Sequence, residues 1–254
     1  MAEQGNHHRL TRAGGFTLVE LAVVLLIVVL LLGSILVPLN TQVDQRRYSN
    51  TEKQMEQIQD ALVGFALVNR YLPCPARSAT DGTEDRTATE CTTVSGSPKR
   101  TGFLPWVTLG LPPADSWNNL FRYSVAPGFT TSDVNNYFSL TTLSSNSLLK
   151  VQTRNTAGAL QDLTNENIPA VVISHGKNGY GATAAENSAV HFIPGSWVGD
   201  EKTNATVTGI DPNFYIWRTR TENTGATGGE FDDIMMWLSP SVLSTRMVAA
   251  GRLP

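Results

Sequence analysis

The sequence predicts an α+β fold in which one long N-terminal helix precedes an antiparallel β-sheet. A continuous apolar run near the N-terminus passes directly into a segment with helical periodicity. Beyond it lie short runs rich in aromatic and β-branched residues, separated by Gly, Asn, Pro and Asp. One helix followed by a series of strands is typical of α+β proteins, in which the helix covers an antiparallel sheet.

The composition excludes several classes of protein. The chain has 254 residues, with 19 Lys and Arg against 22 Asp and Glu, a formal net charge of −3, and two cysteines. A net negative chain without a basic block is not typical of a nucleic-acid binder that neutralises phosphates. Two cysteines are too few for a disulfide-dense scaffold or a four-cysteine zinc site.

The first half of the expected helix is apolar on every side. No charged residue occurs from Leu21 to Leu39, and about 20 apolar helical residues cross a bilayer core. The pattern therefore predicts a single transmembrane helix over 16–39. A cleavable signal peptide is the alternative, but the run exceeds an ordinary signal core of about 7–15 residues.

The second half of this helix, over 40–70, is expected to be amphipathic. Its apolar stripe follows alternating spacings of three and four and consists of Tyr48, Thr51, Met55, Ile58, Leu62 and Phe65. This spacing places the stripe on one helix face. We expect the helix to run from Phe16 to Val68, with the stripe packed on its own sheet; a homodimeric coiled coil is the alternative.

A specific motif precedes the apolar run. Gly15 and Phe16 are followed by Glu20, four residues after the phenylalanine. This resembles the signal of type IV prepilins and type II secretion pseudopilins. The resemblance implies that 1–15 is a leader peptide, that a prepilin peptidase cuts between Gly15 and Phe16, and that Phe16 becomes N-methylated. A carboxylate beside an apolar helix needs a partner, so we expect an assembly role in which Glu20 pairs with the Phe16 amine of a neighbouring subunit; an acid that only favours the helix dipole is the alternative.

The same resemblance implies a fold, a function and a location. The fold would be the pilin fold, with no enzymatic activity. The chain would be a structural subunit of a type II secretion pseudopilus or a type IV pilus, as a minor or specialised component. Its partners would be the prepilin peptidase, other pilins or pseudopilins and an inner-membrane assembly platform. The chain would cross the bacterial inner membrane once, with its C-terminal domain in the periplasm, or become extracellular in a surface pilus. The alternative is a membrane-tethered periplasmic domain that binds or hydrolyses a ligand.

The remaining residues, 71–254, are expected to form a β-rich globular domain. The expected strands are Leu120–Val125, Tyr137–Leu143, Leu148–Arg154, Ala170–Ser174, Phe214–Arg220 and Phe231–Leu238. A short final helix is expected to start with Ser239 as N-cap and Pro240 in the first turn. Cys74 and Cys91 would form a disulfide in an oxidising compartment; two free thiols are the alternative.

Two further segments extend the resemblance. PPADSWNNLFRYSV is similar to a D-x-W-G-N segment of major pseudopilins, with Asn118 at the glycine position. SHGKNGYGA is similar to their S-x-G-x-D-G-x-x-G loop, a calcium-binding region in that family. The resemblance makes calcium a candidate cofactor, with Asp232 and Asp233 as ligands. Lys177 occupies a position near an expected aspartate, and an ammonium group does not ligate calcium.

Catalytic motifs give little support for an enzyme. The segment GKNGYG matches neither a phosphate-binding P-loop nor a dinucleotide-binding loop. Outside the leader the histidines are His175 and His191. A hydrolytic pair of histidine with Asp232 remains as a minor alternative.

Overall fold

The fold is described from a computed structural model. The structure describes residues 15–94, 96–126, 128–135, 137–139, 141, 149–164, 168–191, 198–206 and 214–253, except for the side chains of 32–39. Residues 1–14 of the predicted leader therefore lie outside the described residues. The chain divides into two compact units, Met1–Gln45 and Arg46–Pro254.

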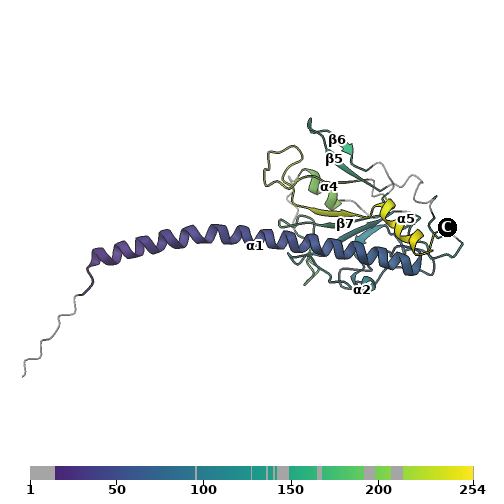
Figure 1. The fold of residues 1–254 in the computed structure, drawn as a ribbon, viewed down its shortest axis with the longest axis horizontal. Coiled ribbons are helices and arrows are strands. Elements are labelled where there is room, and N and C mark those ends of the chain that lie inside the picture. The colour runs from purple at the N-terminus through teal and green to yellow at the C-terminus, as the bar shows by residue number, and fades with distance from the viewer. Residues whose placement is uncertain are drawn as a thin grey trace, which may run out of the picture. The chain divides into compact units, whose positions relative to one another are not determined.

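Helix α1 spans Leu18–Asn69 and contains 52 residues (Figure 1). It starts two residues later and ends one residue later than the sequence predicts. The helix ends at Asn69 because Arg70 adopts a positive φ of 66°, a left-handed conformation that terminates helices. The backbone N–H of Arg70 still donates to the carbonyl of Ala66 at 2.8 Å.

The transmembrane first half of this helix, and with it the predicted fold class, is corrected by the structure. Within the described residues, no helix has a stretch long and apolar enough to cross a membrane. The described apolar run from Leu21 to Leu31 is shorter than the roughly 20 residues that a bilayer core requires. The side chains of 32–39, which complete the predicted span, lie outside the described residues. Of the predicted fold class, only the α+β arrangement of helices and strands agrees with the structure.

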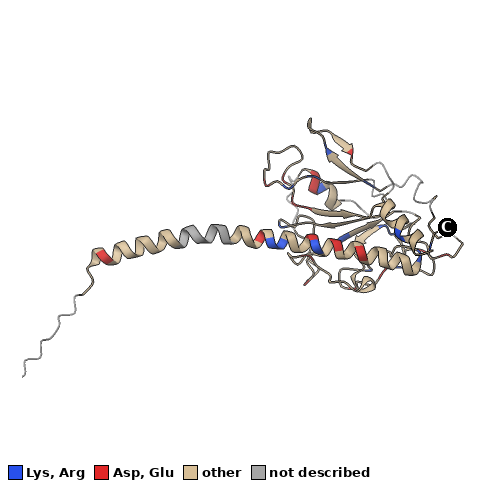
Figure 2. Cartoon of the chain, in the orientation of Figure 1, with Lys and Arg blue, Asp and Glu red and all other residues tan. Residues whose placement is uncertain are grey.

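The charges on α1 differ between its two ends. After Glu20 the described helix has no charged residue before Asp44, and from there Lys, Arg, Asp and Glu recur along it (Figure 2). The recurring charges lie on the faces that the apolar stripe leaves open. The exposed charges and the buried stripe together make this second half of the helix amphipathic.

The main sheet is antiparallel and has the strand order β3-β4-β7-β9. Its strands are β3 (Thr101–Phe103), β4 (Arg122–Val125), β7 (Ala170–Ser174) and β9 (Ile234–Trp237). The two central strands pair with Tyr123 opposite Val172. All five residues of β7 are buried, as expected for a strand covered on both faces.

A second sheet has the order β6-β5-β8. It contains β5 (Lys150–Arg154), β6 (Leu160–Asp162) and β8 (Phe214–Ile216). Strands β5 and β8 are parallel, with Val151 opposite Tyr215, so the prediction of an antiparallel sheet does not extend to this one. A parallel pair needs a crossover connection, and β7 and α4 (Asp200–Thr206) lie in the intervening chain.

The remaining elements are short. Strands β1 (Thr93–Val94) and β2 (Ser97–Pro98) form a two-stranded ribbon, and α2 covers Trp106–Leu109. The last helix, α5, spans Pro240–Ala249, with Ser239 as N-cap and Pro at its start, as the sequence predicts.

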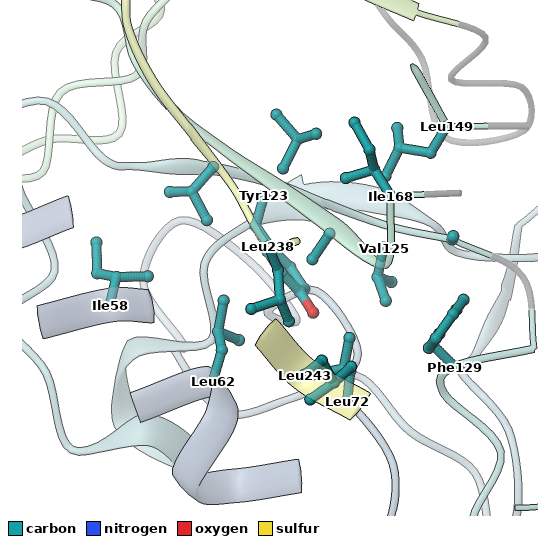
Figure 3. Close-up of a cluster of buried hydrophobic side chains, with 14 of the residues drawn as sticks. Ile58, Leu62, Leu72, Tyr123, Val125, Phe129, Leu149, Ile168, Leu238 and Leu243 are labelled. Carbon is teal, nitrogen blue, oxygen red and sulfur yellow. The ribbon is translucent and has the colours of Figure 1, made fainter. Parts of the chain in front are cut away.

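The predicted apolar stripe of α1 is its buried face. Thr51, Met55, Ile58 and Leu62 are buried. The helix packs in one core with the main sheet and α5: Ile58 and Leu62 belong to the same buried cluster as Leu72, Tyr123 and Leu243, and all five are labelled in Figure 3. The stripe is covered by the chain's own domain, so these residues are not free for a homodimeric coiled coil.

Strand predictions succeed best at the centre of the sheet. The range of β7 matches the prediction, whereas β4, β5, β8 and β9 are shorter than their predicted runs. The predicted strand Tyr137–Leu143 is wrong in its described part, since 137–139 form no strand. Phe138 instead packs its ring on Phe129, with ring centroids 5.3 Å apart. Strands β3 and β6 were not predicted.

Candidate functional site

The proposed cleavage position lies immediately before α1. Residues Gly15, Phe16 and Thr17 are exposed and non-helical, and the helix begins at Leu18. Phe16 is 86% exposed, and nothing lies within 4 Å of a Cβ placed on Gly15. An exposed, extended segment with a glycine is accessible to a protease.

Glu20 has a local partner that the sequence analysis missed. The backbone N–H of Thr17 donates to the Glu20 carboxylate at 2.8 Å, and the Thr17 hydroxyl donates to it at 3.0 Å. In return, the backbone N–H of Glu20 donates to Thr17 Oγ1 at 3.2 Å. This is a capping box, the T-x-x-E pattern that stabilises a helix start. The three-residue spacing between Thr17 and Glu20 in the sequence could have predicted this capping box.

The first turns of α1 present an exposed apolar surface. Every side chain from Gly15 to Leu31 is exposed, and none between Leu21 and Leu31 is charged. Large side chains such as Val29 and Leu30 are about two thirds exposed. Exposed apolar patches of this extent mark interaction surfaces, and a helix that is apolar all round requires a cover.

The loop that follows α1 is held by a disulfide. Cys74 and Cys91 are bonded, with their Cα atoms 5.5 Å apart. Both residues are buried. The bond encloses the segment in which Arg86 pairs with Glu84 at 2.9 Å and stacks over the ring of Tyr71 at 4.2 Å.

The D-x-W segment forms a tight loop that binds α1 and β7. Asp115 accepts hydrogen bonds from the backbone N–H groups of Trp117 and Asn119, both at 2.9 Å, and from the Ser174 hydroxyl. The ring of Trp117 packs edge-on against Tyr48 of α1, with centroids 4.7 Å apart. Burial raises the pKa of Asp115, and the bond from Ser174 opposes that rise.

Asn118 adopts the conformation that its glycine counterpart would favour. Its φ is +66°, in the left-handed region where asparagine is the most tolerated residue after glycine. The side chain is exposed. The substitution therefore preserves the turn that places Asn119 and Asp115 together.

Asp232 and Asp233 belong to a cluster with a third carboxylate. Carboxylate oxygens of Glu201, Asp232 and Asp233 all lie within 4.8 Å of one another. Glu201 comes from α4, which the sequence analysis did not predict. Glu201 lies close to Asp232 and Asp233 because of the crossover between β5 and β8. No local sequence pattern could therefore have predicted this proximity.

Hydrogen bonds fix this acidic cluster (Glu201, Asp232 and Asp233) to its surroundings. The side-chain amide of Asn178 donates to Glu201 at 2.9 Å, and its backbone N–H donates to Asp232 at 2.8 Å. The backbone N–H of Asp232 donates to Glu201. Asp233 accepts from Asn204 at 2.8 Å. The SHGKNGYGA loop thus reaches the cluster through Asn178, the residue near which an aspartate was expected.

Burial and neighbouring negative charges raise the pKa values of Glu201 and Asp232. Burial first, and then the charges of Asp233 and Asp232, raise the pKa of Glu201 to about 9. Burial also raises the pKa of Asp232 to about 6, opposed by the backbone N–H of Asn178. Such shifts show that three ionised carboxylates are poorly compensated by the surrounding protein.

The cluster fits a divalent cation. Asp232 Oδ1 is buried and has no hydrogen-bond partner among the residues that the structure describes, and hard cations such as calcium prefer carboxylate oxygens. Glu201, Asp232 and Asp233 would hold the ion, which would offset two of their three negative charges and tie α4 to β9 and its preceding loop. The amide of Asn178 donates to Glu201, so this side chain supports the cluster without offering its nitrogen as a ligand.

The histidines do not form the suggested pair with Asp232. His175 is 2% exposed and its Nδ1 lies 3.2 Å from Asp233. His191 is exposed. A group as buried as His175 fits a role in fixing Asp233 better than contact with a substrate.

No protein-family model, curated protein or solved structure significantly matches this chain.

Proposed function

We propose that the chain is a pilin-like structural subunit, cut between Gly15 and Phe16 by a prepilin peptidase. It would then be added through its N-terminal helix to a type II secretion pseudopilus or a type IV pilus, as a minor or specialised component. Its partners would be other pilins or pseudopilins and an inner-membrane assembly platform.

The observation that carries this proposal is the start of α1. An exposed glycine–phenylalanine bond is followed at once by an exposed helix surface with a carboxylate, Glu20, and no further charge through Leu31. A helix that exposes apolar groups on every side gains free energy by packing against copies of itself, at about 25 cal/mol per Å² of apolar surface buried.

The proposed mechanism is polymerisation by burial, with Glu20 setting the register. After cleavage, Phe16 would carry a positively charged terminal amine. A carboxylate buried among apolar helices is costly unless it is paired, so only the stagger that brings Glu20 to a neighbour's amine would be favourable. In that arrangement the Glu20 carboxylate would either lose its hydrogen bonds from Thr17 or accept from both Thr17 and the neighbour's amine.

The disulfide supports the proposed location of the C-terminal part. Disulfides persist in oxidising compartments such as the bacterial periplasm, and Cys74 and Cys91 are joined in the structure. The bond agrees with a domain that faces the periplasm or the extracellular medium.

The decisive experiment is mass spectrometry of the N-terminus of the protein purified from its native host. We expect a chain that begins with N-methylated Phe16, and a Gly15→Leu variant that keeps residues 1–15. A mature chain that begins at Met1, or beyond residue 39, would overturn the proposal.

A second experiment separates assembly from the alternative of a tethered domain that binds or hydrolyses a ligand. Residues 16–39 are replaced by an unrelated hydrophobic helix of equal length. A filament subunit should no longer co-purify with filaments after this change. Retention of full biological activity by the replacement would favour the tethered domain.

A further inference from the structure

A pocket opens at one end of the second sheet. Its walls come from the end of β5 and the turn toward β6, the segment after β8, and the loop near Thr227. Its volume is about 370 Å³, within the range of pockets that hold small ligands. None of its lining residues belongs to α1, the helix through which assembly is proposed.

Two lining residues of the pocket, Arg154 and Arg218, form an ion-pair network with the buried Asp200. Arg154 donates to both oxygens of Asp200, at 2.8 and 2.7 Å, and Arg218 Nε lies 3.0 Å from the same carboxylate. Further bonds hold the two guanidinium groups to the backbone carbonyls of Gly158 and Thr227. Two guanidinium charges therefore face one buried carboxylate.

The walls offer several hydrogen-bonding groups that the chain does not use. The hydroxyls of Thr153, Thr156, Thr219 and Thr227 line the pocket and make no hydrogen bond with any residue that the structure describes. Asn155 uses its Oδ1 to accept from two backbone N–H groups, both at 3.0 Å. Each hydroxyl can both donate and accept.

One aromatic side chain completes the lining. Trp217 is 37% exposed, and its ring packs edge-on against Trp237 with centroids 6.4 Å apart. This contact holds the indole in place, since Trp237 belongs to β9 of the main sheet. An anchored, partly exposed indole provides an apolar face beside polar groups.

We propose that this pocket binds a short saccharide that carries a carboxylate group. The C–H face of a sugar ring packs on an indole, and its hydroxyls need partners that donate and accept, as the unpaired threonines do. The surplus of one positive charge matches a single carboxylate. Most guanidinium N–H groups are already committed to Asp200 and to backbone carbonyls, so the pocket is poorly suited to the several oxygens of a phosphate.

The test is isothermal titration of the purified full chain with a trisaccharide of two galactose units and one terminal galacturonic acid, which carries a single carboxylate, and, as a neutral probe, galactose trisaccharide. We expect the acidic probe to bind about tenfold more tightly than the neutral one, because an ionic hydrogen bond is stronger than a neutral one. Added salt should weaken the binding of the acidic probe. Equal affinity for both probes, or no heat with either, would overturn the proposal.

Variants assign the binding to this pocket. Thr219→Val removes an exposed hydroxyl at nearly constant shape and should weaken binding about three- to tenfold, the loss of one hydrogen bond. Trp217→Ala should weaken it about tenfold. Thr92→Val, at a threonine outside the pocket, is the matched control. Binding that survives both pocket variants unchanged, or that falls equally in the control, would place the ligand elsewhere and refute the proposal.

Discussion

Thr17 and Glu20 form reciprocal hydrogen bonds at the start of α1. The backbone N–H of Thr17 donates to the Glu20 carboxylate at 2.8 Å, and the backbone N–H of Glu20 donates to Thr17 Oγ1 at 3.2 Å. Glu20 can therefore act locally by capping the start of α1, in addition to the proposed pairing with a neighbour's amine. The two roles make different predictions.

Substitutions at these two residues separate capping from assembly. Thr17→Ala breaks the capping box, at a cost of about 1 kcal/mol in helix stability, whereas Glu20→Gln keeps an oxygen that accepts from the Thr17 backbone N–H. Only Glu20→Gln removes the carboxylate. We expect normal processing of both variants, incorporation of Thr17→Ala into filaments, and loss of incorporation for Glu20→Gln, measured by the amount of subunit in sheared filaments. If both variants assemble normally, the intersubunit pairing is wrong.

The acidic cluster predicts a pH-dependent stability. Folding raises the pKa of Glu201 from 4.5 to about 9. A carboxylate with a raised pKa stabilises the folded state while protonated, and this contribution is lost as pH rises through the folded value. Without divalent cations, we therefore expect the free energy of unfolding to fall between about pH 4.5 and 9. Glu201→Gln should flatten this dependence in urea titrations at several pH values.

Calcium should restore the free energy of unfolding that is lost as the pH rises. An ion bound by Glu201, Asp232 and Asp233 replaces the protons, so added calcium should raise the melting temperature at pH 8 and a chelator should lower it. Asp162→Asn is a matched control, because Asp162 is an acid outside the cluster that pairs with Lys150. A calcium effect of equal size in the cluster variant Asp232→Asn would contradict binding at this site.

The disulfide predicts a measurable contribution to stability. Cys74 and Cys91 are separated by 17 positions, and closing a loop of this length stabilises the folded state by about 3 kcal/mol in the chain-entropy model. We expect the double variant Cys74→Ala, Cys91→Ala to lower the free energy of unfolding by about that amount, measured by urea unfolding. Reducing agent should destabilise the wild type and leave the variant unchanged.

Asn118 predicts opposite effects for two substitutions. At φ +66°, Asn118→Gly removes the steric cost of the side chain and should be neutral or stabilising. Asn118→Val places a β-branched residue in a left-handed conformation and should cost about 1–2 kcal/mol. Chemical unfolding of both variants gives the comparison. Because the side chain is exposed, similar stabilities would mean that the backbone conformation differs from the one described.

The sequence predicted features that depend on neighbours along the chain. The spacing of Met55, Ile58 and Leu62 identified the buried face of α1, because 3.6-residue periodicity survives in any tertiary setting. The β-branched residues Val171, Val172 and Ile173 identified the central strand β7, because they are contiguous in the sequence. The limits of α1 were predicted to within two residues.

The failed predictions concern features that distant residues control. Phe138 lies in a run with strand-like composition, but its ring fills a place beside Phe129 and the run forms no strand in the described part. The transmembrane span rested on counting apolar residues through Leu39, and the described helix does not contain such a span.

The sequence by itself determined the amphipathic helix, the central strand and the position of the glycine–phenylalanine bond, because each is encoded in a contiguous stretch. Only the tertiary structure decided that Glu201 joins Asp232 and Asp233, and that Arg154 and Arg218 share Asp200. These groups come from separate elements, and the parallel pairing of β5 with β8 brings them together. Like charges approach this closely only when the free energy of packing the whole fold outweighs their mutual repulsion, and no local sequence pattern reports that balance.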